Sequence, residues 1–322
     1  MKNVIKAAHD VHIHNYLSGC CHDMQATVEN YINIERANGV RLMGFANHAW
    51  DESVPLPDTK SWGVDMYKKH VMAYEMQIKP QIPEDTGDLM VLVGAETEYC
   101  GMFDVLGMGK EAALTLDFLL IPHTHVHMTD FVMPAPPAKP VDDARARLEA
   151  LLSGVEGVTP DRAAKWASKL PIEELKYYMT EEIDLAAQAK FISDFMIQSF
   201  EGLMNNEVLK SYSHLIPVSV AHPFQPVGYH HIRTAAQAMI PDNTYGELFS
   251  VAAARGIGLE INCATNDAES FRLYGIAKEC GCKFTLGTDA HSRAALSAID
   301  RTQPLIDHLA LTEDDLMAFV RV

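Results

Sequence analysis

Short hydrophobic runs rich in Val, Ile and Leu alternate along the chain with longer segments of helix-like periodicity. This alternation is typical of βα units whose strands form a buried parallel sheet. The pattern predicts seven strands, at 7–14, 40–46, 89–95, 116–121, 215–221, 257–262 and 283–288. It predicts helices between them, at 24–39, 62–79, 181–206 and 268–280. The sequence therefore predicts an α/β fold.

One region interrupts this order. Almost a hundred residues separate the fourth and fifth predicted strands, and they begin with the proline-rich segment FVMPAPPAKP. Connections in compact α/β units are usually far shorter. Helical pieces are predicted at 142–153, 160–169 and 171–179. We interpret 128–210 as a large insertion, with a helical lid or subdomain over about 128–180 and then a barrel helix, in a chain (1–322) that otherwise forms a single domain. A surface insertion that only pads the fold is the alternative.

Charge and composition exclude some classes of function. The formal net charge of −17 argues against an extended nucleic-acid surface, because such surfaces depend on clustered Lys and Arg. No apolar run approaches the ~20 residues of a membrane span, and the N-terminus does not have the pattern of a secretory signal. The expected location is cytoplasmic. A phosphate group would have to be bound locally, through metals.

Histidine and acidic residues gather where the predicted strands end. The carboxyl ends of parallel strands in an α/β barrel meet at one rim, which is where such folds place their active sites. Six of the seven predicted strands deliver a candidate ligand there, whereas the sixth ends in EINC with Asn262. These candidates are His12, His14, His48, Glu96, the histidines of PHTHVH (122–127), His222, Asp289 and His291.

The spacing of these residues favours metal binding. His12 and His14 point to one face, because side chains alternate along a strand, and Asp289 and His291 repeat the spacing. One histidine at a strand end is usually structural, but the joint pattern indicates a cluster. Imidazole with carboxylate suits zinc, manganese or iron, whereas calcium and magnesium prefer oxygen ligands.

An ordered set of motifs resembles a known family. DVHIH, NHA, GAE, AHP and TDAH resemble, in the same order, the motifs of the PHP (polymerase and histidinol phosphatase) family, over about residues 8–300. The resemblance implies a distorted seven-stranded (β/α)7 TIM-like barrel with two or three divalent transition metals (Zn, Mn or Fe). It also implies metal-dependent hydrolysis of phosphate esters by a metal-bound hydroxide.

The resemblance also implies a set of ligands, in which Glu96 bridges two metals. By position they are His12, His14, His22, His48, Glu96, His123 or His125, His222, Asp289 and His291. His123, His125 and His127 share one parity, so spacing does not choose among them, and the lead-in PHT favours His125 over His123. Asp10 opens the first motif and is expected to support the ligands.

Candidates for catalysis outside the ligand set follow the AHPF motif. His230 and Arg233, in GYHHIRTAAQ, could bind the substrate phosphate or protonate the leaving group, or could simply begin a solvated helix. Asp289 could transfer a proton. Glu98 shares parity with Glu96 and is either a further site residue or a polar residue of the rim.

The favoured function is hydrolysis of a small phosphomonoester, such as histidinol phosphate or a sugar or nucleotide phosphate. The alternative is a nucleotide phosphodiesterase or 3′ exonuclease, which the acidic composition disfavours. A non-catalytic metal-binding barrel is a third reading. Amidohydrolases also open with HxH, but no lysine ends a predicted strand here. The sequence does not predict the oligomeric state.

Overall fold

The computed structural model describes residues 3–70, 72, 76–135, 139–170, 172–175, 178, 184–263 and 266–322. Its strands are β1 (His9–Ile13), β2 (Leu42–Phe45), β3 (Met90–Val93), β4 (Ala95–Glu96), β5 (Tyr99–Cys100), β6 (Val105–Leu106), β7 (Leu119–Leu120), β8 (Val218–Val220), β9 (Gly258–Asn262) and β10 (Phe284–Gly287). Its main helices are α1 (Val28–Ala37), α2 (Trp62–Tyr67), α4 (Lys110–Ala113), α5 (Lys139–Ser153), α6 (Pro160–Lys169), α7 (Ile172–Leu175), α8 (Leu185–Asn205), α9 (Glu207–Tyr212), α10 (Arg233–Ala238), α11 (Asp242–Ala254), α12 (Ala268–Glu279) and α13 (Gln303–Leu309).

The parallel strands form two sheets that meet at the third predicted strand. One sheet has the order β1-β2-β3 and the other β10-β9-β8-β7-β4. The segment 89–95 divides at Gly94, so that β3 pairs with β2 while β4 pairs with β7. A Cβ atom on residue 94 would lie 2.6 Å from the Phe118 carbonyl oxygen, so only glycine permits this approach. On the far side, a bridge between Ile13 and Ala290 places β1 beside the end of β10.

The α/β class and all seven predicted strand positions are confirmed, because each predicted range contains a parallel strand. The closed seven-stranded barrel is not confirmed. Within the described residues, the parallel strands pair as two sheets rather than as one continuous ring. The short antiparallel pair of β5 and β6 was not predicted, because two-residue strands leave no periodicity to detect.

Three of the predicted helices match α1, α8 and α12 closely, and each begins at a side-chain cap. Thr27 accepts the Asn30 N–H, Asp184 the Ala187 N–H and Asp267 the Ser270 N–H. The helix predicted over 62–79 is not continuous, because α2 ends at Tyr67 and α-helical residues return at 72 and 76. Just after α2, His70 Nδ1 donates to the Met66 carbonyl oxygen. The backbone carbonyl oxygen of His70 accepts the Trp50 N–H. Residues 71 and 73–75 lie outside the described residues.

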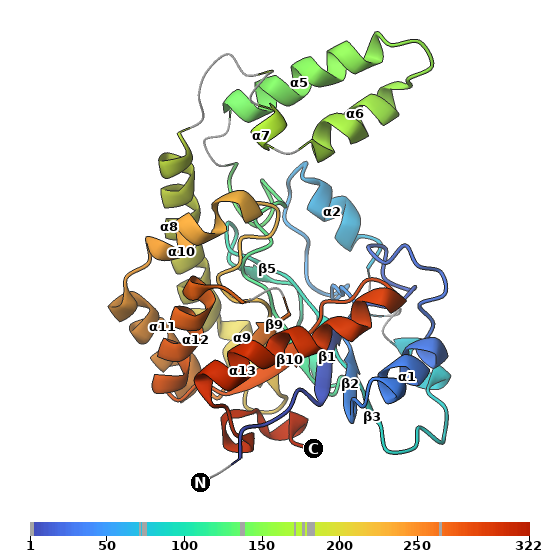
Figure 1. Cartoon of the computed structure of the whole chain (residues 1–322), viewed down its shortest axis with the longest axis vertical. Coiled ribbons are helices and arrows are strands. Elements are labelled where there is room, and N and C mark those ends of the chain that lie inside the picture. Colours follow the sequence, from blue (N-terminus) through green and yellow to red (C-terminus); the bar gives the residue numbers. More distant parts are fainter. Residues whose placement is uncertain are drawn as a thin grey trace.

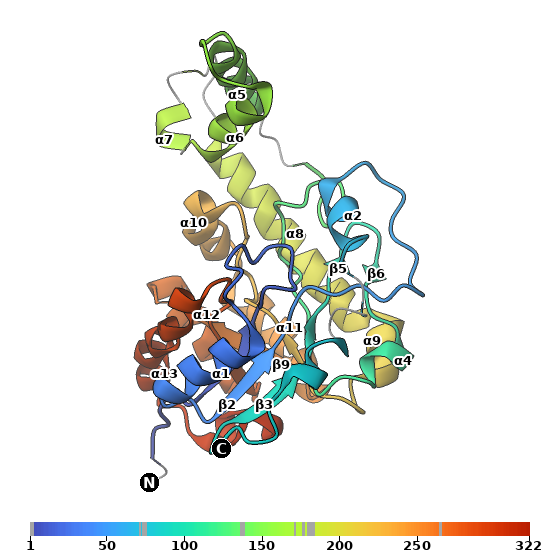
Figure 2. The ribbon, with the colours of Figure 1, turned by 90° about the vertical axis from the view of Figure 1, so that its right-hand side faces the viewer.

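The segment between β7 and β8 divides into parts that pack differently. Figure 1 shows α5, α6 and α7 above the sheets, and Figure 2 shows the long helix α8 running from them down beside the strands. Four buried residues form a small core of their own: Ala144, Leu148, Ala167 and Leu175. Residues 128–133 and α8 contribute instead to the main core. The predicted pieces 142–153 and 160–169 match α5 and α6. The piece predicted over 171–179 contains α7, and its residues 171, 176, 177 and 179 lie outside the described residues. The role as a lid stays a prediction.

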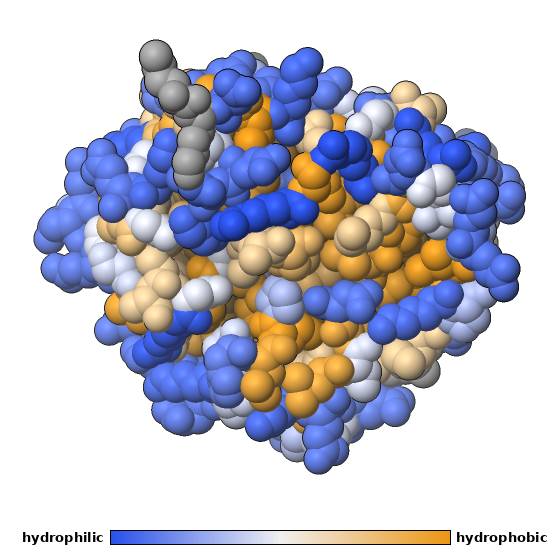
Figure 3. Space-filling view, turned by 90° about the horizontal axis from the view of Figure 1, so that it is seen from below, coloured by the Kyte–Doolittle hydropathy of each residue, from blue (hydrophilic) through white to orange (hydrophobic). Residues whose placement is uncertain are grey.

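The opposite end of the molecule carries both termini (Figure 1). Seen from below, hydrophobic residues gather in a band across this face, with hydrophilic residues around them (Figure 3). No helix in the described part of the chain combines the length and the hydropathy that crossing a membrane requires.

Candidate metal centre

The carboxyl ends of the strands bring their histidines and acids to one place. β1 supplies His12 and is followed by His14, β4 ends in Glu96, and the loops after β2, β7, β8 and β10 supply the remainder. Among the described residues, three groups have ligand atoms that all lie within 4.8 Å of one another. The groups are His12, His14 and Asp289; Glu96, His125 and His222; and His14, Cys20, His48 and His291.

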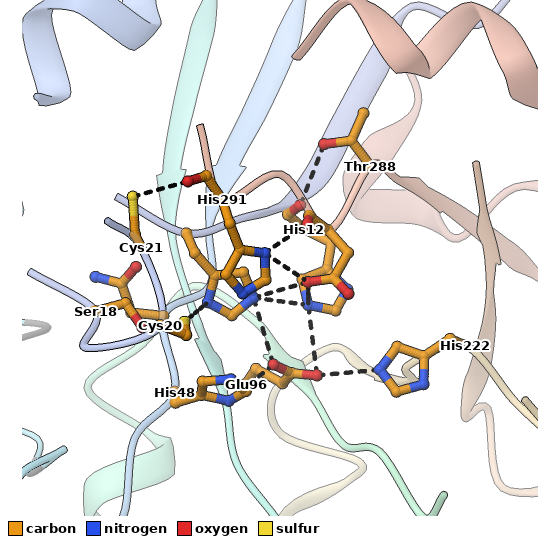
Figure 4. Close-up of polar contacts among 12 residues, drawn as sticks. His12, Ser18, Cys20, Cys21, His48, Glu96, His222, Thr288 and His291 are labelled. Atoms are coloured by element: carbon orange, nitrogen blue, oxygen red, sulfur yellow. Dashed lines mark hydrogen bonds and ion pairs between the residues drawn. The ribbon is translucent and has the colours of Figure 1, made fainter. Parts of the chain in front are cut away.

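Glu96 lies at the centre of the cluster (Figure 4). Its carboxylate is almost completely buried, and five imidazoles approach it from different strand ends. The nitrogen-to-oxygen distances are 3.4 Å for His12, 3.4 Å for His14, 2.9 Å for His48, 3.6 Å for His125 and 3.3 Å for His222. A carboxylate in this position can share its two oxygens between neighbouring cations.

Two further buried carboxylates fix which ring nitrogen carries the proton. His12 Nδ1 lies 2.7 Å from Glu260 Oε1, and His125 Nδ1 lies 2.7 Å from Glu98 Oε2. When the acid is ionised, the Nδ1–H donates to it, which directs Nε2 toward the cluster. This carboxylate–histidine arrangement is the one that orients metal-binding imidazoles in proteins.

The inner atoms of the cluster lack ordinary partners. His12 Nε2 and His14 Nε2 lie 3.2 Å apart, and His125 Nε2 faces a Glu96 oxygen at 3.6 Å. His48 Nδ1 and Glu96 Oε2 are buried without a hydrogen bond among the described residues, although they lie 2.9 Å apart. Two hydrogen-bond acceptors that lie this close require a proton or a cation between them. These nitrogen and oxygen atoms therefore fit a bound metal ion.

Burial and charge act in opposite directions on these groups. Burial alone would raise the pKa of Glu96, but the charges of His12 and His48 lower that pKa well below its usual value. Burial alone would lower the pKa of His12, but Glu260 and Glu96 raise it well above its usual value. Burial lowers the pKa of His125 to about 3, so its imidazole is neutral and can act as a ligand. Metal binding to such a cluster must displace protons.

The backbone around the ligands is strained. His222 has a φ of 30° and Asp289 a φ of 55°, in the region that non-glycine residues rarely adopt. The His222 N–H donates to Glu260 Oε2 at 2.6 Å, so one carboxylate orients both His12 and the His222 backbone. Residues held in this way occur mainly at functional sites.

The Glu260 carboxylate fits beside the end of β10 only because residue 287 is a glycine. A Cβ atom on residue 287 would lie 1.9 Å from Glu260 Oε1 and 2.5 Å from His12 Cβ. Asp10 supports the same strand ends, because it accepts the N–H of Thr288 at 3.0 Å and that of His12 at 3.2 Å. This fits the supporting role predicted for Asp10, which ties β1 to the segment that carries Asp289.

The structure brings most of the predicted ligands together but not His22 or His123. His22 is exposed and belongs to none of the three groups, and Cys20 from the same loop contributes instead. His123 is buried against Phe200 and Phe224, and its Nε2 accepts the Phe224 N–H at 3.1 Å. Of the two histidines left open by the sequence, His125 is therefore the one that reaches the cluster.

The predicted catalytic residues after AHPF lie apart from the cluster. Arg233 begins α10 and forms an ion pair with Asp267, the residue that caps α12. His230 is exposed on the short 3-10 helix His230–Ile232. Neither residue is among those that line the pocket over the cluster. Asp289, the third predicted catalytic residue, does line it.

A pocket of about 530 Å³ opens over the cluster. Its floor includes Glu96, His125, Asp289 and the group around Cys20, and its walls include residues of α2. Trp62 on α2 is 47% exposed, and its ring lies 5.3 Å from that of His127 across the pocket. The candidate ligands are thus accessible to a small molecule from one side.

The sequence does not identify three residues that the structure brings to the cluster: Glu260, Glu98 and Cys20. Glu260 lies inside the sixth strand rather than at its end, and the position of Glu98 fits both a site residue and a polar residue of the rim. The parity of Glu260 with Asn262 was the available signal, because both side chains point to one face of the strand. Nothing in the spacing distinguished Cys20 from the neighbouring residues of its loop.

Comparison with known proteins gives one informative likeness. No family model matches the chain, and no curated protein matches it in sequence. Among solved structures, it resembles histidinol phosphate phosphatase from Lactococcus lactis, complexed with zinc, L-histidinol and phosphate. The TM-score is 0.54 at 16% sequence identity, covering 95% of this chain and 94% of that chain. The chain therefore shares the fold of that phosphatase over nearly its full length.

Proposed function

We propose that the chain is a metal-dependent hydrolase of small phosphomonoesters. The observation that carries the proposal is the orientation of the buried imidazoles. Glu260 and Glu98 fix the protons of His12 and His125 on Nδ1, so that both Nε2 atoms face a carboxylate oxygen of Glu96. A site that only needed structural histidines would satisfy these nitrogens with backbone N–H groups.

The proposed ligands follow the three groups. His12, His14 and Asp289 would hold one ion, and Glu96, His125 and His222 another, with Glu96 shared between neighbouring ions. A third set contains His48 and His291. Two or three ions of zinc, manganese or iron suit these donors. Bound divalent ions lower the pKa of coordinated water and stabilise the charge on phosphate oxygens.

Local charge explains how an acidic protein would bind a phosphate ester. The chain carries a net charge of −17, so the positive charge must be concentrated at the site. The ions would supply most of it, and Lys69 adds a cation at the wall of the pocket. A volume of about 530 Å³ is within the range of small-molecule pockets. The bound L-histidinol and phosphate of the Lactococcus protein support a substrate of this size.

The chain's own groups would handle the proton that leaves the attacking water. Asp289 lines the pocket, and the charges of His12 and His14 hold its pKa below the usual value despite burial. It is therefore ionised at neutral pH, but it could take a proton only transiently, because a carboxylate with a lowered pKa is a weak base. Arg233 and His230 would need to reorient to contact a substrate.

We also propose that the two sheets form the wall of a distorted seven-stranded barrel. The joint at Gly94 and the bridge between Ile13 and Ala290 would complete the ring. Helices α5 to α7 would then stand over the rim that holds the ligands, as a lid is expected to do.

The test is a substrate panel with metal-loaded protein. Zinc-, manganese- and iron-loaded samples are assayed for phosphate release from histidinol phosphate, sugar phosphates, nucleoside monophosphates and matched diesters. We expect higher kcat/KM for monoesters than for diesters. A preference for diesters would favour the nucleotide phosphodiesterase alternative, and the absence of hydrolysis with all three metals would refute the proposal.

A further inference from the structure

Cys20 occupies the position in the cluster that a histidine was expected to fill. Its Sγ atom lies 3.9 Å from His14 Nδ1 and belongs to the group that includes His48 and His291. The side chain is partly buried and lines the pocket. Figure 4 shows Cys20 and His48 on one side of Glu96, with His222 on the other.

The neighbouring imidazoles are oriented as ligands. His291 donates from Nδ1 to the Asp289 carbonyl oxygen at 2.8 Å, which leaves the Nε2 lone pair for the group. His48 is 8% exposed, and its Nδ1 atom faces Glu96 Oε2 at 2.9 Å without a hydrogen bond among the described residues. These two observations are independent of the sulfur atom and point to a cation in the same place.

The loop that carries Cys20 is held firmly. Asn15 and Asn47 exchange hydrogen bonds of 2.8 Å, which join this loop to the one that carries His48. The Gly19 N–H donates to His70 Nε2 at 2.7 Å. A Cβ atom on residue 19 would lie 2.9 Å from the His70 ring, so the approach requires glycine. The thiol position is thus set by contacts on both sides.

His14 cannot serve two groups at once. A neutral imidazole offers one lone pair, and His14 Nε2 already lies 3.1 Å from Asp289 in the group with His12. If His14 binds there, Cys20, His48 and His291 remain for the third position. Three protein ligands with an open fourth position is the arrangement of catalytic zinc sites. Tetrahedral bond lengths give a sulfur-to-nitrogen separation of roughly 3.6 Å, within the 4.8 Å that bounds the distances in the group.

We propose that the Cys20 thiolate, His48 and His291 form a sulfur-containing metal site, open to the pocket. The site differs chemically from the other two, which hold only imidazole and carboxylate. A soft thiolate favours zinc or cobalt over manganese or magnesium. The inference deepens the proposed function, because it adds Cys20, which the sequence motifs do not contain, to His48 and His291 as the ligands of one ion of the same cluster.

Cobalt substitution tests this assignment directly. Metal-free protein is titrated with Co(II) to full occupancy, and the absorption spectrum is recorded for wild type, Cys20→Ser and Cys21→Ser. We expect a sulfur-to-cobalt charge-transfer band in wild type and in Cys21→Ser, and its loss in Cys20→Ser. Cys21 is the matched control, because its thiol donates to the His291 carbonyl oxygen at 3.2 Å and belongs to none of the ligand groups.

A second readout does not depend on the substitution. Cys20 should react with a thiol reagent in the metal-free protein and be protected after loading with zinc, as identified by peptide mapping. A fully loaded wild type without the band, or a Cys20→Ser variant that retains it, would overturn the assignment. Neither readout uses phosphate release. A band in a protein without phosphatase activity would therefore refute the proposed function alone, and an active protein without the band would refute only this inference.

Discussion

Two regions of the molecule hold buried histidines, and they use them differently. At the rim, His125 directs its Nε2 atom toward a Glu96 oxygen 3.6 Å away. In the hydrophobic layer beneath, His123 accepts the Phe224 N–H at 3.1 Å, and His9 accepts the Leu286 N–H at 2.9 Å. His123 and His125 are two residues apart in one loop, and both are less than 6% exposed.

The comparison shows that burial and residue type do not identify a ligand. What separates the regions is the group that faces the imidazole lone pair. A backbone N–H occupies the Nε2 lone pair of His123 and that of His9, so neither lone pair requires a cation. A carboxylate oxygen cannot donate, so the rim histidines require protons or metal ions. Three experiments would break or sharpen this distinction.

The largest effect is expected for Glu96→Gln. The amide keeps the shape of the side chain but removes the charge that five imidazoles approach. Changes outside the ligands already cost 10- to 100-fold in metal affinity or activity, so we expect a loss of more than about 100-fold in both. Elemental analysis and the phosphomonoester assay measure it. Full metal content in this variant would remove Glu96 from the proposed ligands.

The second experiment compares His125→Ala with His123→Ala. His125→Ala should lower metal affinity by at least about 10-fold, because it removes a proposed ligand. His123→Ala should keep the metal content but lower the free energy of unfolding by roughly 3 kcal/mol, since it leaves a cavity and an unpaired Phe224 N–H.

Each variant of this pair is the control for the other. Metal content is measured after dialysis against a weak chelator, and stability is measured by urea denaturation of the metal-free proteins. If His123→Ala lost metal and His125→Ala did not, the assignment between the two histidines would be reversed.

The smallest effect is expected for the pH dependence of stability that comes from His9, in the hydrophobic layer beneath the rim. Burial lowers the pKa of His9 to about 3 from its usual value of 6.5. A lowered histidine pKa contributes stability that is fully present above pH 6.5 and is lost as the pH falls toward 3. In metal-free protein, His9 should add about 1.4 kcal/mol per pH unit to the loss of unfolding free energy as the pH falls through this window.

His9→Gln isolates this contribution, because an amide oxygen can accept the Leu286 N–H without titrating. Urea denaturation at a series of pH values should give a shallower slope for the variant than for wild type below about pH 6.5. Equal slopes would show that His9 is protonated in the folded protein.

The sequence by itself determined the strands and the rim. Apolar runs of strand length fix where β1 and β10 lie, and the shared direction of parallel strands places His12 and Asp289 at the same rim. Because the carboxyl ends of parallel strands lie at one edge, the residues at those ends are neighbours in the folded chain. The order of the motifs predicted that Glu96 and His222 lie at the same rim.

The tertiary structure alone decided which neighbours face one another. Cys20 rather than His22 reaches the cluster because contacts with Asn47 and His70, far away in sequence, set the shape of that loop. Glu260 became visible only when β9 paired beside β10, where Gly287 leaves space for its carboxylate against His12. Loop conformation and lone-pair direction depend on such long-range contacts, whereas periodicity reports only local geometry.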